Sequence, residues 1–281
     1  MIDLHSHSTA SDGRLTPAKL VELAVRRGLS VLALTDHDTT AGLEEAQNAC
    51  LAAGLTFVPG IEWEVQHTGE FHLLGLGLRD WGGKFQKAVT VLQGLREDRN
   101  RKIFSKMQEA GMRGHFEDIE ELAEGGVVGR PHFARWLVAR GIVKTVQEAF
   151  THFLGRGKLF WEPKAGLELS QAVELIHQAG GLAIVAHPFS LALSWEALKD
   201  QLTRWKALGL DGLEAWHPAA TTAACLRLEA LARSLELKVS AGSDFHGENR
   251  PDRILGHTAG RQPISCRFYE ELFSVSEGVC R

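Results

Sequence analysis

The sequence of 281 residues contains few cysteines and no cysteine pair motif. Its cysteines are widely spaced, and no CxxC pair occurs among Cys50, Cys225, Cys266 and Cys280. This spacing indicates neither a disulfide framework nor a cysteine zinc site, and it favours a reducing, cytoplasmic setting.

The chain also lacks a basic excess and a long apolar run. Lys and Arg together number 31 against 35 Asp and Glu, which gives a net charge of −4 at pH 7. Proteins that bind duplex nucleic acid usually carry a basic excess, so no duplex DNA partner is expected. No apolar run approaches the roughly 20 residues that span a bilayer, and the N-terminal residues do not resemble a signal peptide, so no membrane partner is expected. These properties leave the oligomeric state open.

Short apolar runs alternate with amphipathic segments along most of the chain, which is the pattern of an α/β fold. Seven strands with helices between them predict a closed or nearly closed barrel. The strands are expected at about residues 1–7, 30–36, 55–63, 71–78, 181–187, 210–216 and 237–243.

One connection between expected strands is too short for a crossover helix. Only six residues separate Glu64 from Phe71, so these two strands should form an antiparallel hairpin. The hairpin would place His72, at the start of its second strand, beside Glu62 at the end of its first.

The segment from about residue 95 to residue 165 interrupts the alternation of strands and helices. It is rich in charged residues with helical spacing and has few strand candidates. We therefore expect a barrel formed by residues 1–94 and 166–281, and a helical insertion, residues 95–165, that caps the active site.

Histidine and carboxylate side chains stand at the C-terminal ends of nearly all the expected parallel strands. In parallel α/β barrels, active sites assemble at this end. A single histidine at a strand end usually has a structural role, but one at nearly every strand end is difficult to explain by packing. The candidate metal ligands are His5, His7, Asp12, His37, Glu62, His72, His187, Asp244 and His246.

The candidate ligands offer only nitrogen and oxygen donors, which suit zinc, manganese or iron. They are too many for one ion and imply two or three. Such a centre would favour an anionic substrate, and phosphate esters are natural candidates. Two members have ordinary alternatives, since Asp12 could be a turn residue and His72 a half-exposed strand histidine.

Six motifs in the sequence resemble those of the polymerase and histidinol phosphatase (PHP) family. They are DLHSHSTASDG, LALTDHDT, VPGIEWE, FHLLGLG, IVAHP and SDFHG, in this order between residues 3 and 247. The resemblance implies a distorted (β/α)7 barrel and a centre of three divalent ions, with Mn²⁺ expected and Zn²⁺ or Fe²⁺ as alternatives. It assigns the first ion to His5, His7, Asp244 and a bridging Glu62, the second to Glu62, His72 and His187, and the third to Asp12, His37 and His246.

The insertion contains GRPHFARWLVARG and AFTHFLGRGKLFWEP, which are similar to a bacterial group within this family. That group includes a 3′,5′-nucleotide bisphosphate phosphatase and a 5′→3′ exoribonuclease that acts on short RNA. The resemblance implies a metal-dependent phosphoesterase that removes the 3′-phosphate of nucleoside 3′,5′-bisphosphates to give 5′-monophosphates, with short single-stranded RNA as a related substrate. The alternatives are a histidinol-phosphate phosphatase and a noncatalytic metal-binding PHP module.

Three further residues are candidates for contact with the substrate. Arg130 and Arg135 could bind phosphate if the insertion caps the barrel mouth, and His217 could protonate the leaving group or bind the substrate. The ordinary alternatives are solvated helix-face residues for both arginines and a structural histidine for His217. Asp36 and Asp38 flank His37 and are expected to orient it or to cap the next helix.

Overall fold

Seven strands form one sheet in chain order in the computed structural model, which describes residues 1–67, 70–123, 125–163 and 166–274. A backbone bridge joins Ser6, just after the first strand, to Phe245, just after the last, so the sheet nearly closes on itself. The predicted α/β barrel is therefore confirmed. Its strands are β1 (Ile2–Asp3), β2 (Val31–Leu34), β3 (Thr56–Glu64), β4 (His72–Leu76), β5 (Leu182–Val185), β6 (Gly212–Trp216) and β7 (Lys238–Ala241).

The strand β4 runs against both of its neighbours, whereas the other pairs in this sheet are parallel. In the β3–β4 hairpin Glu64 lies opposite His72 and Glu62 opposite Leu74. The predicted hairpin is thus confirmed, and it places the start of β4 at the mouth where the parallel strands end.

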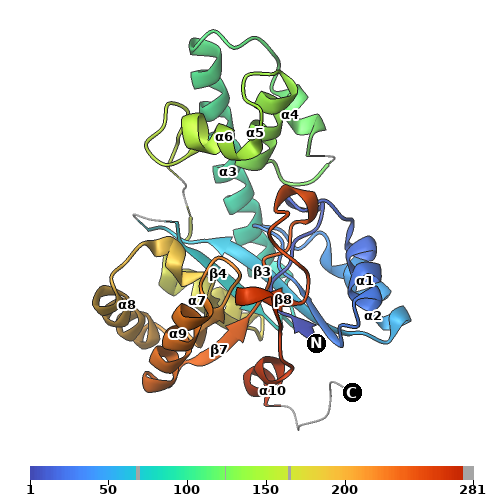
Figure 1. Ribbon diagram of the computed structural model, residues 1–281, viewed down its shortest axis with the longest axis vertical. Helices are drawn as coiled ribbons and strands as arrows, with labels where there is room; N and C mark the ends of the chain where they lie inside the picture. The colour runs from blue at the N-terminus through green and yellow to red at the C-terminus, as the bar shows by residue number, and fades with distance from the viewer. Residues whose placement is uncertain (68–69, 124, 164–165, 275–281) are drawn as a thin grey trace.

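Helices surround the barrel (Figure 1). Local sequence determines their ends, as at Thr16, whose hydroxyl accepts a hydrogen bond from the Lys19 amide while Pro17 occupies the first turn. The helices are α1 (Pro17–Arg26), α2 (Leu43–Ala53), α7 (Leu169–Gln178), α8 (Trp195–Ala207), α9 (Thr222–Ser234) and α10 (Arg267–Phe273). Smaller elements are the short strands β8 (His257–Thr258) and β9 (Gln262–Pro263) and the 3₁₀ turns η2 (Pro188–Leu191), η3 (Gly247–Asn249) and η4 (Ala259–Arg261).

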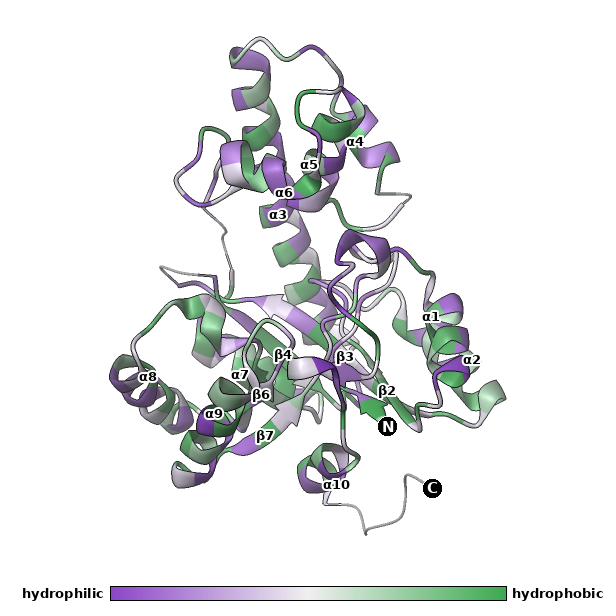
Figure 2. Ribbon diagram, viewed as in Figure 1, coloured by the Kyte–Doolittle hydropathy of each residue, from purple (hydrophilic) through white to green (hydrophobic). Residues whose placement is uncertain are grey.

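A group of helices projects beyond the barrel mouth on the long helix α3 (Figure 1). Phe85 and Val89, near the start of α3, pack in the barrel core, whereas Ile103 and Met107 pack in a second core. Hydrophilic and hydrophobic residues alternate along α3 (Figure 2), as expected for a helix with a packed and an exposed side. The helices of this region are α3 (Gly83–Glu109), α4 (Glu117–Glu121), α5 (Arg130–Ala139), α6 (Val146–Ala149) and the π-helical turn η1 (Phe150–Leu154).

The cysteines differ from expectation at one position. Cys50 and Cys225 are free and buried, but Cys266 takes part in a disulfide, and Cys280 lies outside the described residues. The sequence did not indicate this bond because spacing along the chain does not report proximity in space. None of the helices in the described part of the chain is long and apolar enough to cross a membrane.

Candidate metal centre

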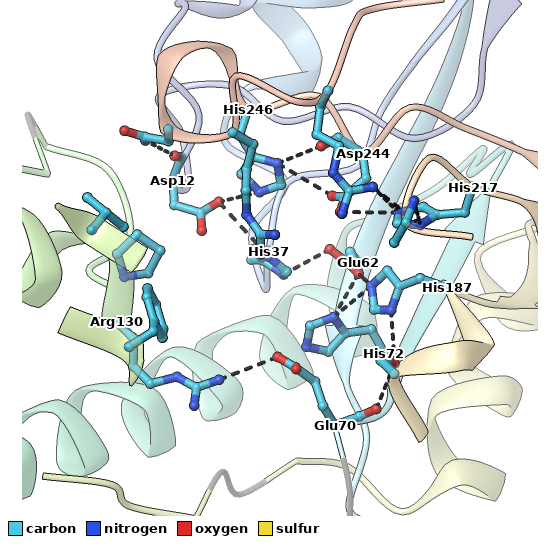
Figure 3. A pocket seen from close by; sticks show the side chains of 18 of the residues that line it. Asp12, His37, Glu62, Glu70, His72, Arg130, His187, His217, Asp244 and His246 are labelled. Carbon is cyan, nitrogen blue, oxygen red and sulfur yellow. Dashed lines mark hydrogen bonds and ion pairs between the residues drawn. The ribbon is translucent and has the colours of Figure 1, made fainter. Parts of the chain in front are cut away.

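The barrel mouth brings the nine candidate ligands together. They come from the ends of the strands and from the loops that follow them, and the start of β4 supplies His72 through the hairpin. Most are buried, with His37 and His187 partly exposed toward a cavity (Figure 3). Eight of them fall into three overlapping groups of donor atoms, each of which could hold a metal ion, and His187 adjoins the group of His37, Glu62 and His72 through contacts with Glu62 and His72.

The first group contains His5, His7, Glu62 and Asp244. The two Nε2 atoms of the histidines lie 3.1 Å apart, and each lies 3.3–3.5 Å from Glu62 Oε2 and Asp244 Oδ1. Donors that share an ion tetrahedrally at ~2.1 Å would be about 3.4 Å apart. The spacing therefore fits one divalent ion.

The second group uses the other oxygen of the same glutamate. Glu62 Oε1 lies 2.8 Å from His72 Nδ1 and 2.8 Å from His187 Nε2, and these two nitrogens lie 3.2 Å apart. Because Glu62 directs Oε2 to the first group and Oε1 to the second, its carboxylate has the arrangement of a bridge between two ions.

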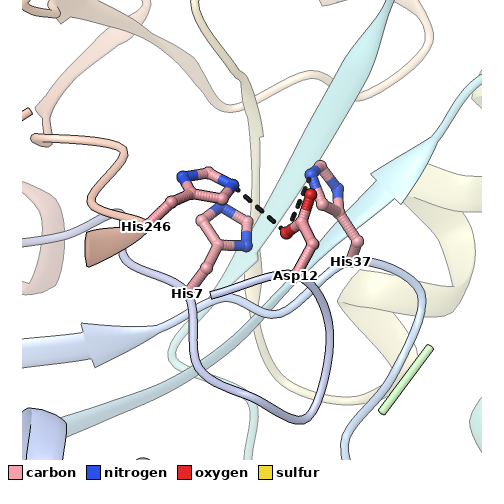
Figure 4. Close-up of side chains that lie close together, drawn as sticks. All are labelled: His7, Asp12, His37 and His246. Atoms are coloured by element: carbon pink, nitrogen blue, oxygen red, sulfur yellow. Dashed lines mark ion pairs between the residues drawn. The ribbon is translucent and has the colours of Figure 1, made fainter. Parts of the chain in front are cut away.

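The third group shares His7 with the first and also contains Asp12, His37 and His246 (Figure 4). Asp12 Oδ1 is 3.2 Å from His246 Nε2 and 4.0 Å from His37 Nε2. His7, Asp12, His37 and His246 each offer a donor atom within 4.8 Å of the others. Asp12 therefore belongs to the cluster, and its loop position does not leave it as an isolated turn residue.

Two carboxylate oxygens in the cluster make no hydrogen bond within the described part of the chain. These are Asp12 Oδ1 and Glu62 Oε2, both of which are shielded from solvent. Buried polar atoms nearly always have a partner. Divalent cations would supply it, so the residues present fit a metal centre of nitrogen and oxygen donors.

The electrostatics of the cluster keep its carboxylates ionised. Burial alone would raise the pKa of the Glu62 carboxyl, but the imidazoles of His37 and His72 outweigh it and hold this pKa well below its usual range. The pKa of Asp244 is lowered in the same way, against burial, by His246 and His5. Burial lowers the pKa of His37 well below its usual value. Ionised carboxylates and a neutral imidazole are the forms that bind metal.

Two of the ring nitrogens turned away from the cluster have carboxylate partners. His5 Nδ1 lies 3.1 Å from Glu214 Oε1, and His72 Nε2 lies 3.2 Å from Glu64 Oε2. Such partners fix the orientation of metal-binding histidines. The sequence assigned no role to either glutamate, although Glu64 ends β3 and Glu214 lies in β6.

The two aspartates beside His37 have other roles than expected. Asp36 accepts hydrogen bonds from the Ser8 amide, the Ser8 hydroxyl and the Ser11 hydroxyl, and so holds the loop between His7 and Asp12. Asp38 forms a salt bridge with Arg96 of α3. Neither belongs to the donor groups found among the described residues.

A cavity of about 420 Å³ opens over the donor cluster, between the barrel loops and the helices beyond the mouth (Figure 3). Arg130, at the start of α5, lines it as expected, and so does His217. Arg135 is not among the described residues that line the cavity, and its guanidinium donates to the Leu122 carbonyl at 3.0 Å. The arginines that line the cavity are Arg96, Arg99, Arg130, Arg250 and Arg253.

On the insertion side of the cavity, Arg99 is the most deeply buried arginine that forms no salt bridge with a carboxylate in the described part of the chain. It is 6% exposed, and its Nη2 donates to Asn100 Oδ1 at 2.9 Å while its Nε makes no hydrogen bond. Burial and the neighbouring guanidiniums of Arg96 and Arg130 lower its pKa to about 9. No local sequence pattern distinguishes Arg99, which lies within the charged run REDRNRK.

His217 lies beside the first donor group. Its Nδ1 accepts a hydrogen bond from the Ala219 amide at 3.2 Å, and its Nε2 lies 3.3 Å from Asp244 Oδ2. Arg253 Nη1 approaches the same ring at 3.1 Å. Burial lowers the pKa of His217, which favours the neutral ring, and the bond from the Ala219 amide to Nδ1 favours the tautomer with its proton on Nε2.

Comparison with known proteins agrees with this site. The PHP domain family matches residues 3–172. A 5′-3′ exoribonuclease from Haemophilus influenzae is 37% identical over 245 residues, which cover 87% of this chain and 89% of the relative. A 3′,5′-nucleoside bisphosphate phosphatase from Chromobacterium violaceum is 33% identical over 275 residues, 96% of each chain.

A solved structure from Bifidobacterium adolescentis has the same fold. It is described as a candidate metal-dependent phosphoesterase, and it matches with a TM-score of 0.85 and 29% identity over 98% of this chain and 97% of its own. The relatives, together with the clustered donors, support metal-dependent hydrolysis of phosphate esters. The chain belongs to the PHP domain family.

Proposed function

We propose that this protein removes the 3′-phosphate of nucleoside 3′,5′-bisphosphates, with three divalent ions, Mn²⁺ first among them, held by the nine donors at the barrel mouth. The observation that carries this proposal is the arginine wall, formed by Arg99 and Arg130, that faces the donor cluster across one cavity. A substrate with two phosphates could place one at the metal centre and the other against Arg99 and Arg130.

The nine donors would hold the ions in the three groups described above. When bound, the ions would lower the pKa of a water molecule and stabilise negative charge on the phosphoryl oxygens. Glu62 would keep the first two groups at a fixed separation because both of its oxygens are engaged. His217 would hold Asp244 through its Nε2 proton, and it could donate the same proton to the departing alcohol oxygen.

Arg130 and Arg99 would bind the second phosphate. Arg130 lies 3.4 Å from Glu70 Oε1, a contact with a half-exposed carboxylate that a substrate phosphate could displace. Burial removes water from Arg99, which strengthens the attraction of its guanidinium to an anion. The same burial makes the positive charge costly when no anion is bound. Arg135 is left out of this proposal because its guanidinium bonds within the insertion.

A second candidate activity is 5′→3′ exonuclease action on short single-stranded RNA. The similarity to the exoribonuclease from Haemophilus influenzae favours it. A 5′-phosphorylated RNA end also carries a 5′-phosphate and a 3′-linked phosphate on one nucleoside, so both substrates suit the same cavity. Histidinol phosphate has one phosphate and would leave the arginine wall unused. A noncatalytic module would not need the full donor set.

A phosphate-release assay with saturating Mn²⁺ tests the proposal. The substrates are adenosine 3′,5′-bisphosphate, adenosine 3′-monophosphate, short 5′-phosphorylated RNA and histidinol phosphate. We expect kcat/KM for the bisphosphate to exceed that for the 3′-monophosphate by about 10–100-fold, the size of one or two charge-assisted phosphate contacts. Parallel assays with Zn²⁺ and Fe²⁺ compare the metals.

Each outcome of this assay has a defined meaning. Equal kcat/KM for the two adenosine substrates would contradict the second-phosphate site. A preference for histidinol phosphate would replace the proposed substrate class. If no substrate released phosphate with any of the three metals, the enzymatic proposal would be wrong.

A further inference from the structure

Glu214 is a buried carboxylate that lies behind the donor cluster. It is 0% exposed in the middle of β6 and belongs to none of the donor groups found among the described residues. It is also absent from the described residues that line the cavity. Glu214 therefore acts on the cluster from outside it, through the residues that it contacts and through the charge of its carboxylate.

The two oxygens of Glu214 contact two different donor groups. Oε1 lies 3.1 Å from His5 Nδ1, whose ring presents Nε2 to the first group. Oε2 accepts a hydrogen bond at 2.8 Å from the backbone amide of His187, whose ring belongs to the second group. Glu214 thus contacts a member of each group from outside the donor cluster, whereas Glu62 supplies a donor oxygen to each group.

The backbone around Glu214 is shaped to allow these contacts. The register of β6 against β7 shifts between Glu214 and Trp216, a bulge of the kind that redirects a side chain. His187 has a φ of 27°, which side-chain-bearing residues rarely adopt, and its amide donates a hydrogen bond to Glu214 in this conformation. A Cβ on Gly242 would lie 2.7 Å from Glu214 Oε1 and 2.3 Å from His5 Cβ, so glycine leaves the space that this pair needs.

We propose that Glu214 is a positioning residue that sets the ring orientation and tautomer of His5 and the backbone of His187, and thereby couples the first two metal-binding groups. With Nδ1–H of His5 donated to Glu214, the lone pair of Nε2 faces the donor cluster. The inference rests on the proposed metal centre. It concerns a residue that would touch neither metal nor substrate.

The substitution Glu214→Gln tests this role with nearly the same side-chain volume. Both carboxylate oxygens accept hydrogen bonds, whereas a glutamine amide has one acceptor and one donor. In either orientation the amide would lose the bond to His5 or the bond to His187. Loss of such a partner typically weakens metal affinity by 10–100-fold.

The measurement is a calorimetric Mn²⁺ titration of EDTA-stripped wild-type protein, Glu214→Gln and the control Glu229→Gln. Glu229 is another buried glutamate, but its partners are Trp216 and arginines on the outer side of the barrel. We expect Glu214→Gln to bind Mn²⁺ 10–100-fold more weakly. The affinity of Glu229→Gln should stay within twofold of wild type.

An affinity of Glu214→Gln within twofold of wild type would overturn the inference, whereas failure of the wild type to bind Mn²⁺ would overturn the metal centre itself.

A measurement on the wild type covers the case in which Glu214→Gln does not fold. In Zn²⁺-loaded protein, the ¹H–¹⁵N spectrum of the histidine rings should show the His5 Nδ1 proton shifted downfield and protected from exchange, because it is buried and donated to a carboxylate. A His5 ring with its proton on Nε2, or an Nδ1 proton that exchanges freely, would contradict the role of Glu214.

Discussion

The barrel mouth and the wall of the cavity that faces it carry opposite charges and are held in different ways. At the mouth, carboxylates and imidazoles sit on strand ends whose backbone is fixed by the sheet, as in the bond from the His7 amide to the Phe245 carbonyl. Across the cavity, Arg99 and Arg130 stand on helices α3 and α5, next to a separate hydrophobic core.

This difference separates the two tasks of the site. The donors that would hold metal depend on the closure of one sheet, so a change in any strand end would affect the chemistry itself. The arginines depend on helices with their own core and could change without disturbing the donors. We infer that the barrel supplies hydrolysis and that the helices beyond its mouth select the substrate.

The largest expected effect belongs to the mouth. Glu62→Ala removes a carboxylate whose two oxygens serve two donor groups. We expect kcat/KM for phosphate release to fall by at least about 10³-fold, or about 4 kcal/mol of transition-state stabilisation, and bound Mn²⁺ to decrease. Steady-state assays and metal analysis check this. A variant that keeps a tenth of the activity would break the assignment of Glu62 as a bridge.

The separate core beyond the mouth provides the next largest effect. Phe133 is 0% exposed in that core, and Phe133→Ala should lower the free energy of unfolding of this region by about 3–4 kcal/mol. Hydrogen exchange should show loss of protection in α5 and the second half of α3 while β2 and β6 keep theirs. Equal loss of protection in both parts would show that the two cores unfold as one unit.

A smaller effect is expected at the arginine wall. Arg130→Ala should raise KM for adenosine 3′,5′-bisphosphate about 10–100-fold, or about 1.4–2.7 kcal/mol, because a charge-assisted contact to phosphate is lost. The kcat for this substrate and the Mn²⁺ affinity should change little. Steady-state kinetics and a Mn²⁺ titration measure these quantities.

Arg135→Ala is the matched control, since it removes the same charge from the same helix without changing the cavity lining. It should leave KM for the bisphosphate within about twofold of wild type. If the two variants raised KM equally, the general positive charge of α5 would account for the selectivity. The proposed contact between Arg130 and the substrate phosphate in the cavity would then be wrong.

The sequence predicted the mouth well for identifiable physical reasons. Parallel strands end at one edge of a barrel, so residues such as His37 and His187 had to meet there. The six-residue connection before His72 determined the reversed strand, and with it the position of that histidine beside Glu62. The barrel and the hairpin follow from local patterns and were confirmed.

The wall and the residues behind the mouth were harder to predict. Which face of a helix meets the cavity depends on how α3 and α5 pack, so the sequence left both Arg130 and Arg135 as candidates, with Arg130 favoured by its place at the Gly-Arg-Pro turn, and offered no reason to choose Arg99. The role of Glu214 could not be predicted because it depends on a bulge in β6 and on the register of β6 against the neighbouring strand β7. Long-range packing decides such contacts, and one sequence does not report it.

The smallest expected effect concerns a carboxylate that belongs to neither region. Glu229 of α9 accepts two hydrogen bonds from Arg267, at 2.8 and 2.9 Å, and one from the Trp216 indole at 2.6 Å. The hydrogen bonds from Arg267 come first among the causes that lower its pKa from 4.5 to about 2. A lowered pKa means that the folded state favours the ionised form, so the stabilisation is complete above about pH 4.5 and disappears as the pH falls toward 2.

Glu229→Gln should therefore lower the free energy of unfolding by about 1–2 kcal/mol at pH 6, a value reduced for screening because the arginine partners are roughly half exposed. Urea unfolding of both proteins at intervals between pH 6 and pH 2.5 would measure the difference, which should shrink steadily below pH 4.5. Phosphate release at pH 7 should stay within about twofold of wild type, because Glu229 touches no donor of the cluster.

A difference in stability that did not vary with pH would mean that lost packing, and not the charge of Glu229, causes it. A large loss of activity would mean that the outer side of the barrel is coupled to its mouth through Trp216. Hydrolysis would then depend on residues outside both the strand ends and the arginine wall.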